Sequence, residues 1–201
     1  PVTVQGAEVG IDTRESAEDL GRLFSGFGSV IGARVFEHTK LERLAAAASV
    51  PVVNLLSDES HPIQTLADLL TIRAEFGQLH DLTIAWVGDA NNVARSLALG
   101  AMLVGAHFRV AHPAGYGFAA KTAADLAKAG CATLVVDDPK VAVSSADVVC
   151  TDAWYSMGQE AEALVRRKAF AHHRVTEELM ALAAPHAIFL HCLPAHRGEE
   201  I

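Results

Sequence analysis

The sequence predicts an α/β protein made of two doubly wound parallel-sheet domains, the first of them incomplete, joined by a long helix. Short apolar runs of strand length alternate with amphipathic segments of helix length along the whole chain, which is typical of parallel sheets with crossover helices. The strand runs are nearly all apolar, as expected for strands covered on both faces. The stretch 77–81 after the longest amphipathic segment is the best boundary between the domains.

The first domain, expected at residues 1–77, contains too few strands to be a complete doubly wound unit. One of its strands opens with Pro51, and proline suits the start of a strand because it has no N–H for the sheet ladder. The long helix opens with Pro62, at the first helical position, where the missing N–H costs nothing. The expected elements are strand 30–35, helix 41–49, strand 50–56 and helix 62–76.

The second domain, expected at residues 78–201, reads as a nearly complete doubly wound unit. One of its helices is followed by Gly130, a typical residue just past a helix C-terminus. The expected strands are 82–87, 107–111, 133–136, 147–151 and 187–192, and the expected helices are 93–104, 119–129, 139–145, 160–170 and 176–183.

Composition excludes several classes of protein. The 201 residues include 16 Lys and Arg against 24 Asp and Glu, a net charge of −8, and phosphate contacts need clustered positive charge. We therefore expect no nucleic-acid partner. Hydrophobic residues make up 51% of the chain, which is too many for a disordered protein. The longest apolar run, 97–106, is far shorter than the roughly 20 residues that cross a bilayer, so we expect no membrane association.

Three cysteines, Cys131, Cys150 and Cys192, are widely spaced without a CxxC pair, which argues against a disulfide framework and for a reducing compartment. The chain opens at Pro1 without Met or a targeting peptide and stops soon after a motif-like stretch. We therefore expect an internal fragment of a cytoplasmic protein, or of a mitochondrial-matrix protein if the source is eukaryotic.

Polar residues just past the strands are the candidates for function, because ligands of open parallel sheets bind beyond the carboxyl ends of the strands. Arg34 lies near the end of the first expected strand and can clamp an anion or extend to water from an edge strand. His61 and Gln64 share one face at the start of the long helix, where they can meet an anion or a polarised carbonyl or act as a cap and a solvated side chain.

The stretch after strand 82–87 contains Asn91 and Asn92. Capping of the next helix explains one asparagine well and the second less well, so one of them can bind an amino acid's carboxylate or amine. The dinucleotide pattern GxGxxG is absent here, which disfavours a dehydrogenase. After strand 147–151, Asp152 can bind an ammonium and Ser156 a carboxylate, or both residues can cap a turn.

His191 and Cys192 close the last strand. Adjacent strand residues point to opposite faces, which argues against a nucleophilic Cys–His pair. No second Cys or His has zinc-ligand spacing, and a lone cysteine is commonly a small buried hydrophobe.

Taken together, these stretches resemble the ornithine carbamoyltransferases, within the aspartate/ornithine carbamoyltransferase superfamily. The HPxQ piece at His61 is similar to that of both branches, whereas the DxWxSMG and HCLP pieces resemble the ornithine branch. The matching stretches, in chain order, are Asp12-Thr13-Arg14 before a helix, Arg34, Ser57-Asp58, His61-Pro62-x-Gln64-x-Leu66-x-Asp68, Gly88-Asp89-x-Asn91-Asn92, Asp152-x-Trp154-x-Ser156-Met157-Gly158 and His191-Cys192-Leu193-Pro194.

The resemblance implies transfer of a carbamoyl group from carbamoyl phosphate to the δ-amine of L-ornithine, giving L-citrulline and phosphate, in a homotrimer or a multiple of trimers and without a metal or organic cofactor. It also implies a role in arginine metabolism, either in the synthesis of arginine (including the urea cycle) or in its breakdown. It implies Arg34, His61 and Cys192 as catalytic residues, with Cys192 accepting a proton. The implied carbamoyl-phosphate contacts are Arg34, His61, Gln64, Cys192 and Leu193, and the implied ornithine contacts are Asn92, Asp152, Ser156 and Met157.

Three departures from the family keep other functions open. The family's C-terminal segment, with a substrate arginine and a closing helix, is not in this chain, so we expect the ornithine-binding domain 78–201 to be truncated at its C-terminus; the other two departures lie near the start. The family's Ser-Thr-Arg-Thr phosphate loop lies upstream of the stretch that Asp12 opens and is not in this chain, and residues 6–10 read GAEVG where the family has a GRGE-like stretch. We therefore expect the fragment alone to be inactive. The alternatives are a carbamoyltransferase for another amine or amino acid and a non-catalytic or regulatory homologue that lacks the phosphate loop.

Overall fold

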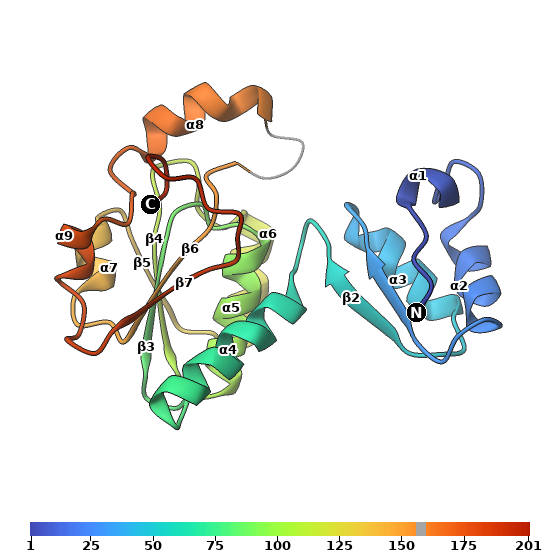
Figure 1. Cartoon of the computed structure of the whole chain (residues 1–201), viewed down its shortest axis with the longest axis horizontal. Helices are drawn as coiled ribbons and strands as arrows, with labels where there is room; N and C mark the ends of the chain where they lie inside the picture. Colours follow the sequence, from blue (N-terminus) through green and yellow to red (C-terminus); the bar gives the residue numbers. More distant parts are fainter. Residues whose placement is uncertain (156–159) are drawn as a thin grey trace. The chain divides into compact units, whose positions relative to one another are not determined.

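The computed structural model describes residues 1–155 and 160–201, which form two compact units, Pro1–Ile63 and Gln64–Ile201 (Figure 1). Sequence analysis placed the domain boundary at residue 77, after the long helix. The long helix α4 (Pro62–Phe76) buries Leu69 and Ile72 in the core of the second unit. By its packing, α4 therefore belongs almost wholly to that unit.

The first unit is a parallel pair of strands covered by helices. Its core is small: Ala17, Leu20 and Leu44 are buried, and Ile31 and Val52 pack against them. The described elements are α1 (Gly6–Val9), α2 (Ala17–Ser25), β1 (Ile31–Arg34), α3 (His38–Ala47) and β2 (Val52–Leu56).

Helix α2 follows from local chemistry that the hydrophobic pattern did not reveal. The Ser16 side chain caps it by accepting a hydrogen bond from the backbone N–H of Asp19, which satisfies one of the free N–H groups at the helix start. Gly21 lets α2 approach α3 closely, because a Cβ at this position would lie 2.5 Å from the carbonyl oxygen of Leu44. The family resemblance, and not periodicity, is what indicated a helix here.

In the described part of the second unit, five parallel strands form one sheet in the order β5-β4-β3-β6-β7. The chain runs outward from β3 to β5 and then returns to place β6 on the other side of β3, so the sheet is doubly wound, as predicted. The elements that follow α4 are β3 (Thr83–Val87), α5 (Asn92–Leu103), β4 (His107–Ala111), α6 (Ala120–Lys128), β5 (Thr133–Val136), α7 (Pro139–Val143), β6 (Val148–Thr151), the 3₁₀ turn η1 (Glu160–Glu162), α8 (Ala163–Phe170), α9 (Glu177–Met180) and β7 (Ile188–His191).

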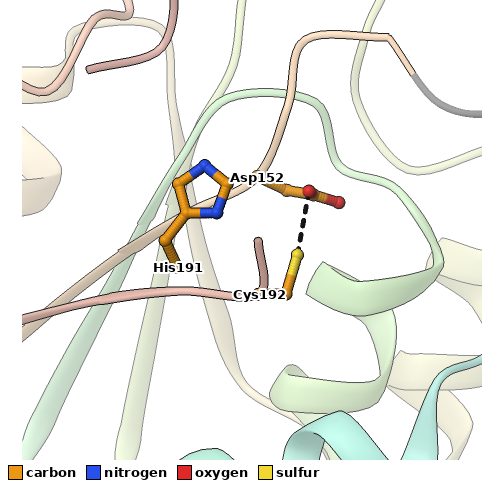
Figure 2. Close-up of side chains that lie close together, drawn as sticks. All are labelled: Asp152, His191 and Cys192. Atoms are coloured by element: carbon orange, nitrogen blue, oxygen red, sulfur yellow. Dashed lines mark hydrogen bonds between the residues drawn. The ribbon is translucent and has the colours of Figure 1, made fainter. Parts of the chain in front are cut away.

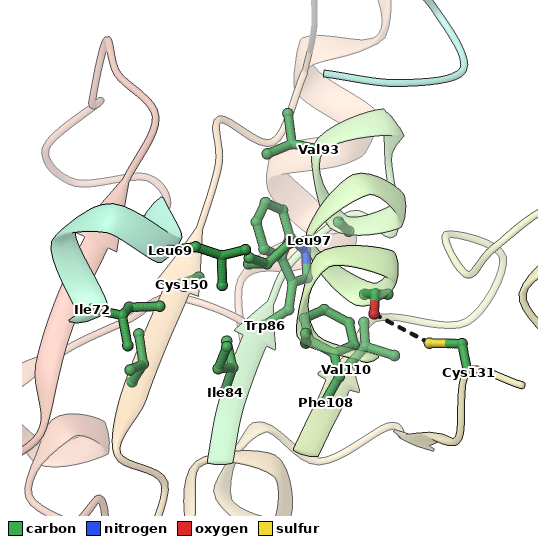
Figure 3. Packing of buried hydrophobic residues seen from close by; sticks show 14 of the residues in the cluster. Leu69, Ile72, Ile84, Trp86, Val93, Leu97, Phe108, Val110, Cys131 and Cys150 are labelled. Atoms are coloured by element: carbon green, nitrogen blue, oxygen red, sulfur yellow. Dashed lines mark hydrogen bonds between the residues drawn. The ribbon is translucent and has the colours of Figure 1, made fainter. Parts of the chain in front are cut away.

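Strand β3 is buried along its whole length because helices cover both faces of the sheet. Its side chains alternate between the faces. Ile84 and Trp86 join the cluster formed with α4, α5 and α6 (Figure 3), whereas Ala85 and Val87 join the cluster formed with α7 and α9. This two-sided burial explains the continuous apolar run from which the strand was predicted.

The predicted strands and helices from residue 30 onward are present, with changes at their ends. The predicted helix 176–183 is reduced to Glu177–Met180, the predicted helix 160–170 begins as a 3₁₀ turn, and the predicted strand 187–192 ends at His191. The last difference matters for function, because it places Cys192 beyond the strand. In the part of the chain that the structure describes, no helix combines the length and apolar character that a membrane crossing requires.

Candidate active site

The candidate site of the second unit lies at the carboxyl ends of β3, β6 and β7, which are neighbours in the sheet. Asp152 follows β6, Cys192 follows β7 and Asn91 follows β3. The doubly wound topology reverses direction between β3 and β6, and this switch point is where such sheets bind ligands. The structure therefore brings together side chains that are 40 and 61 positions apart in the sequence.

Cys192 and Asp152 form a direct hydrogen bond. The Sγ atom of Cys192 donates to Oδ1 of Asp152 at 2.9 Å (Figure 2). Burial raises the pKa of the Cys192 thiol, and the neighbouring carboxylates of Asp152 and Asp68 raise it further, because a second negative charge beside an anion is unfavourable. The thiol is therefore protonated at neutral pH and acts as a hydrogen-bond donor in this geometry.

Asn91 holds the other oxygen of Asp152. Its Oδ1 accepts hydrogen bonds from the N–H groups of Val93 and Ala94 at the start of α5, and its Nδ2 donates to Oδ2 of Asp152 at 2.8 Å. Asn91 is thus the helix cap of the Asn91-Asn92 pair. The sequence suggested that one asparagine caps the helix, but it carried no signal for the bond to Asp152.

The alternation of side chains along a strand predicted that His191 and Cys192 point to opposite faces of the sheet. This prediction is wrong, because a ring nitrogen of His191 and the Sγ atom of Cys192 lie close together. Because β7 ends at His191, alternation does not extend to Cys192. Asp152, His191 and Cys192 each offer one atom that can bind a metal, and these three atoms lie within 4.8 Å of one another. A carboxylate oxygen, an imidazole nitrogen and a thiol sulfur are all ligand types that zinc accepts.

Both ring nitrogens of His191 already have partners. The backbone N–H of Leu193 donates to Nδ1 at 2.8 Å, so Nδ1 accepts and Nε2 carries the proton. The Nε2–H group then donates to Oε1 of Glu200 at 3.2 Å. A cation at His191 would have to break the Leu193 bond, so His191 serves here to shape the loop that follows Cys192.

Glu200 anchors that loop from inside the unit. Its side chain is fully buried and accepts hydrogen bonds from His191 and from the backbone N–H of His196. Burial is the largest single effect and raises the pKa of Glu200, but these two hydrogen bonds, together with a backbone hydrogen bond of Glu200 itself and the nearby His196 ring, outweigh burial and lower the pKa. Sequence analysis missed Glu200, because nothing in the pattern marks this acidic residue as buried.

A buried ion pair joins the end of β3 to the segment after Asp152. Arg166 on α8 contacts Oδ2 of Asp89 at 2.6 Å and also donates to the carbonyl oxygen of Trp154 and to Glu162. Burial raises the pKa of Asp89, and Arg166 opposes that rise. The pair fixes the backbone next to Asp152 and was also missed by sequence analysis.

Gln64 lies on α4, where its Nε2 donates to Oδ1 of Asp68 at 2.9 Å. Leu193, the other predicted residue of the last loop, is exposed and has a φ of 59°. Asn92 begins α5, and its carbonyl oxygen accepts from the Ser96 hydroxyl. The predicted residues Ser156 and Met157 lie outside the described residues.

Arg34 and His61 belong to the first unit. Arg34 is the last residue of β1, is exposed, and its guanidinium has no ion-pair partner among the described residues. His61 follows the turn after β2, which the backbone hydrogen bond from Ser57 to Ser60 closes. Both residues therefore lie at the carboxyl ends of the paired strands β1 and β2, where an anion site was predicted.

Comparison with known proteins identifies the class to which this fold and site belong. Residues 2–74 match the family model of the carbamoyl-P binding domain of the aspartate/ornithine carbamoyltransferases, and residues 80–201 match the model of their Asp/Orn binding domain. The chain belongs to the aspartate/ornithine carbamoyltransferase family.

Individual relatives are similar across almost the whole chain. An ornithine carbamoyltransferase from Symbiobacterium thermophilum is 51% identical over 191 residues, which is 93% of this chain and 62% of the relative. One from Acidothermus cellulolyticus is 48% identical over 205 residues, covering 100% of this chain and 66% of the relative. The chain thus spans less than two thirds of the length of these curated relatives.

Solved structures of ornithine carbamoyltransferases are also similar to this chain. The ornithine carbamoyltransferase of Thermus thermophilus has a TM-score of 0.86 at 43% identity, covering 98% of this chain and 64% of that chain. The ornithine carbamoyltransferase of Pyrococcus furiosus has a TM-score of 0.88 at 43% identity, covering 96% of this chain and 63% of that chain. These scores confirm the predicted α/β class with parallel sheets.

Proposed function

We propose that this chain acts in carbamoyl transfer from carbamoyl phosphate to the δ-amine of L-ornithine, giving L-citrulline and phosphate. The observation that carries the proposal is the carboxylate of Asp152, held between Asn91 and Cys192 at the switch point of the second sheet. A fixed carboxylate at this place suits an ammonium group. The similarity to proteins named ornithine carbamoyltransferase supports ornithine as the molecule that carries this ammonium group.

The proposed division of labour follows the two domains. Residues 1–77 hold carbamoyl phosphate through Arg34 and His61, and residues 78–201 hold ornithine through Asn92, Asp152, Ser156 and Met157. The family models for residues 2–74 and 80–201 support this assignment by their descriptions. The exposed guanidinium of Arg34 suits the phosphate dianion.

Gln64, Cys192 and Leu193 complete the carbamoyl-phosphate contacts in the proposal. The δ-nitrogen attacks the carbamoyl carbon, the bond from that carbon to the phosphate oxygen breaks, and phosphate leaves with the electron pair. Positive groups such as Arg34 and His61 stabilise the charge that develops on the carbonyl oxygen.

The proton of the attacking amine must also be accounted for. Because the Cys192 thiol is protonated and already donates to Asp152, Cys192 can accept a proton only by passing its own to Oδ1 of Asp152. The two side chains together then take up one proton. Cys192 is therefore proposed as a relay beside Asp152 rather than as a free thiolate base.

The resemblance further supports a homotrimer, or a multiple of trimers, that works in arginine metabolism in the cytoplasm, or in the mitochondrial matrix if the source is eukaryotic. Sedimentation of the protein at micromolar concentration tests the trimer. A monomer at that concentration contradicts it.

The decisive experiment is a citrulline assay on the chain expressed with any sequence that flanks it in its gene. Citrulline formation is expected to require both carbamoyl phosphate and ornithine. Equal or faster turnover with aspartate or putrescine would transfer the assignment to another acceptor. Binding of carbamoyl phosphate without turnover of any amine would instead identify a non-catalytic homologue.

A further inference from the structure

Asp68, a carboxyl group that the proposed reaction does not use, lies one helical turn after Gln64 on α4. Oδ1 of Asp68 accepts a hydrogen bond from Nε2 of Gln64 at 2.9 Å. Within the described ranges 1–155 and 160–201, this is the one hydrogen bond that reaches the Asp68 carboxylate. The orientation of the Gln64 carboxamide and that of the Asp68 carboxylate therefore depend on each other.

Asp68 is partly buried in tightly packed and mostly apolar surroundings. Asp68 lines a crevice with Trp86, Val93, Cys150 and Cys192 that leaves no room for a water molecule. Burial raises the pKa of Asp68 to about 6, and the hydrogen bond from Gln64 opposes that rise. The titratable groups that line this crevice with Asp68 are the thiols of Cys150 and Cys192, both with raised pKa values and neutral at pH 7, and the His191 ring, whose nitrogens are hydrogen-bonded to Leu193 and Glu200.

An ionised carboxylate can only accept hydrogen bonds, so it must receive the NH₂ end of the Gln64 carboxamide. The carboxamide oxygen of Gln64 then points away from Asp68 and is free to accept from a ligand. Without the carboxylate, either end of the carboxamide can face the ligand. The presence of Asp68 therefore decides which end Gln64 presents.

We propose that Asp68 is a positioning residue that turns the oxygen of Gln64 toward the NH₂ group of a carbamoyl ligand. This inference rests on the proposed function. The NH₂ group is the one N–H donor of carbamoyl phosphate, whereas its phosphate and carbonyl oxygens accept. A reversed Gln64 would place two donors against each other, so the orientation selects carbamoyl phosphate over an acyl phosphate such as acetyl phosphate, whose methyl group donates nothing.

The test compares Asp68→Asn, Gln64→Ala and the double variant in the citrulline assay. Asp68→Asn is expected to raise KM for carbamoyl phosphate about tenfold, which corresponds to loss of one charge-assisted hydrogen bond, and to leave KM for ornithine within about twofold. The double variant is expected to be no worse than Gln64→Ala, because Asp68 acts through Gln64. Asp125→Asn, which neutralises an exposed carboxylate four residues after Lys121 on α6, is the matched control and should change neither constant.

Acetyl phosphate provides a second readout, as an inhibitor competing with carbamoyl phosphate. The ratio of its inhibition constant to the KM for carbamoyl phosphate is expected to fall about tenfold in Asp68→Asn. An unchanged KM and ratio in a folded Asp68→Asn, or additive effects in the double variant, overturn the inference while citrulline formation by the wild type upholds the proposed function. A wild type that forms no citrulline overturns both.

A comparison without any change at Asp68 covers the case in which Asp68→Asn does not fold. Gln64→Ala should raise KM for carbamoyl phosphate about tenfold at pH 7.5, and this ratio to wild type should fall as pH drops below 6, where Asp68 becomes protonated and no longer fixes which end Gln64 presents. Dividing the KM of Gln64→Ala by the wild-type KM at each pH removes the effect of protonating carbamoyl phosphate, because both proteins meet the same substrate. A ratio that stays constant from pH 7.5 to 5.5 contradicts the inference.

Discussion

The bond between Cys192 and Asp152 predicts how fast the thiol reacts. Two unit charges 2.9 Å apart, at an effective dielectric constant of about 20, repel each other by about 6 kcal/mol. A tenfold change in an equilibrium corresponds to about 1.4 kcal/mol. Asp152→Asn removes this repulsion and keeps the shape of the side chain, so relief of even a quarter of it raises the thiolate fraction of Cys192 about tenfold.

Alkylation by iodoacetamide, followed by mass spectrometry of the peptide that contains Cys192, measures this effect because only the thiolate reacts. The wild-type rate is expected to rise about tenfold per pH unit between pH 7 and 9 without a plateau, since the pKa of the thiol is raised. Asp152→Asn is expected to react at least about tenfold faster at pH 8.

The controls separate the charge of Asp152 from general effects of substitution. Asp125→Asn removes an exposed carboxylate elsewhere and should leave the rate unchanged. Cys131 and Cys150 are buried and should remain unmodified, which shows that the protein stays folded. An unchanged rate in Asp152→Asn, or a wild-type rate that levels off near pH 7, would refute the electrostatic reasoning.

Three other predictions concern the division of labour and the two buried anchors. In the citrulline assay, Arg34→Ala should mainly raise KM for carbamoyl phosphate and Asp152→Ala mainly that for ornithine; equal effects on both substrates would contradict the assignment. Arg166→Met should lower the free energy of unfolding in urea by about 3–5 kcal/mol because it leaves Asp89 buried without its partner, and adding Asp89→Asn should recover part of the loss; no recovery would argue against the ion pair. The lowered pKa of Glu200 stabilises the fold at pH values above the unfolded pKa of about 4.3, and this contribution is lost as pH falls through the folded value. Glu200→Gln should therefore lower the melting temperature at pH 6 and flatten its decline between pH 5 and 3, and a decline as steep as that of the wild type would count against the role of Glu200.

Much of the site was predictable because it obeys a rule of topology. Strands that alternate with helices form parallel sheets, and the residues just past such strands converge at one edge. This rule alone indicated Arg34, His61 and Asp152 as candidates, whereas the role of Cys192 came from the family resemblance. The structure places Arg34 at the last position of β1 and places His61, Asp152 and Cys192 after β2, β6 and β7. The same pattern of apolar runs predicted each strand and the doubly wound order of the second unit.

The partners of these residues were not predictable. Asn91 and Asp152 are 61 positions apart, and Asp89 and Arg166 are 77 apart, so no local pattern signals either contact. Glu200 looks like an ordinary surface acid in the sequence but is fully buried. Sequence reasoning also misplaced Cys192 within β7, because the end of a strand depends on where pairing with its neighbour stops.

The sequence by itself determined the class of fold, the order of its elements and the family, because the hydrophobic period and the short motifs are local properties of the chain. Only the tertiary structure decided the state of the reactive groups: that Cys192 is a protonated donor to Asp152, that Asn91 and not Asn92 is the helix cap, and that Asp68 is a partly buried carboxyl group turned toward Gln64. The physical reason is that protonation and side-chain orientation depend on desolvation and on charges within a few ångströms, and distant parts of the chain supply both.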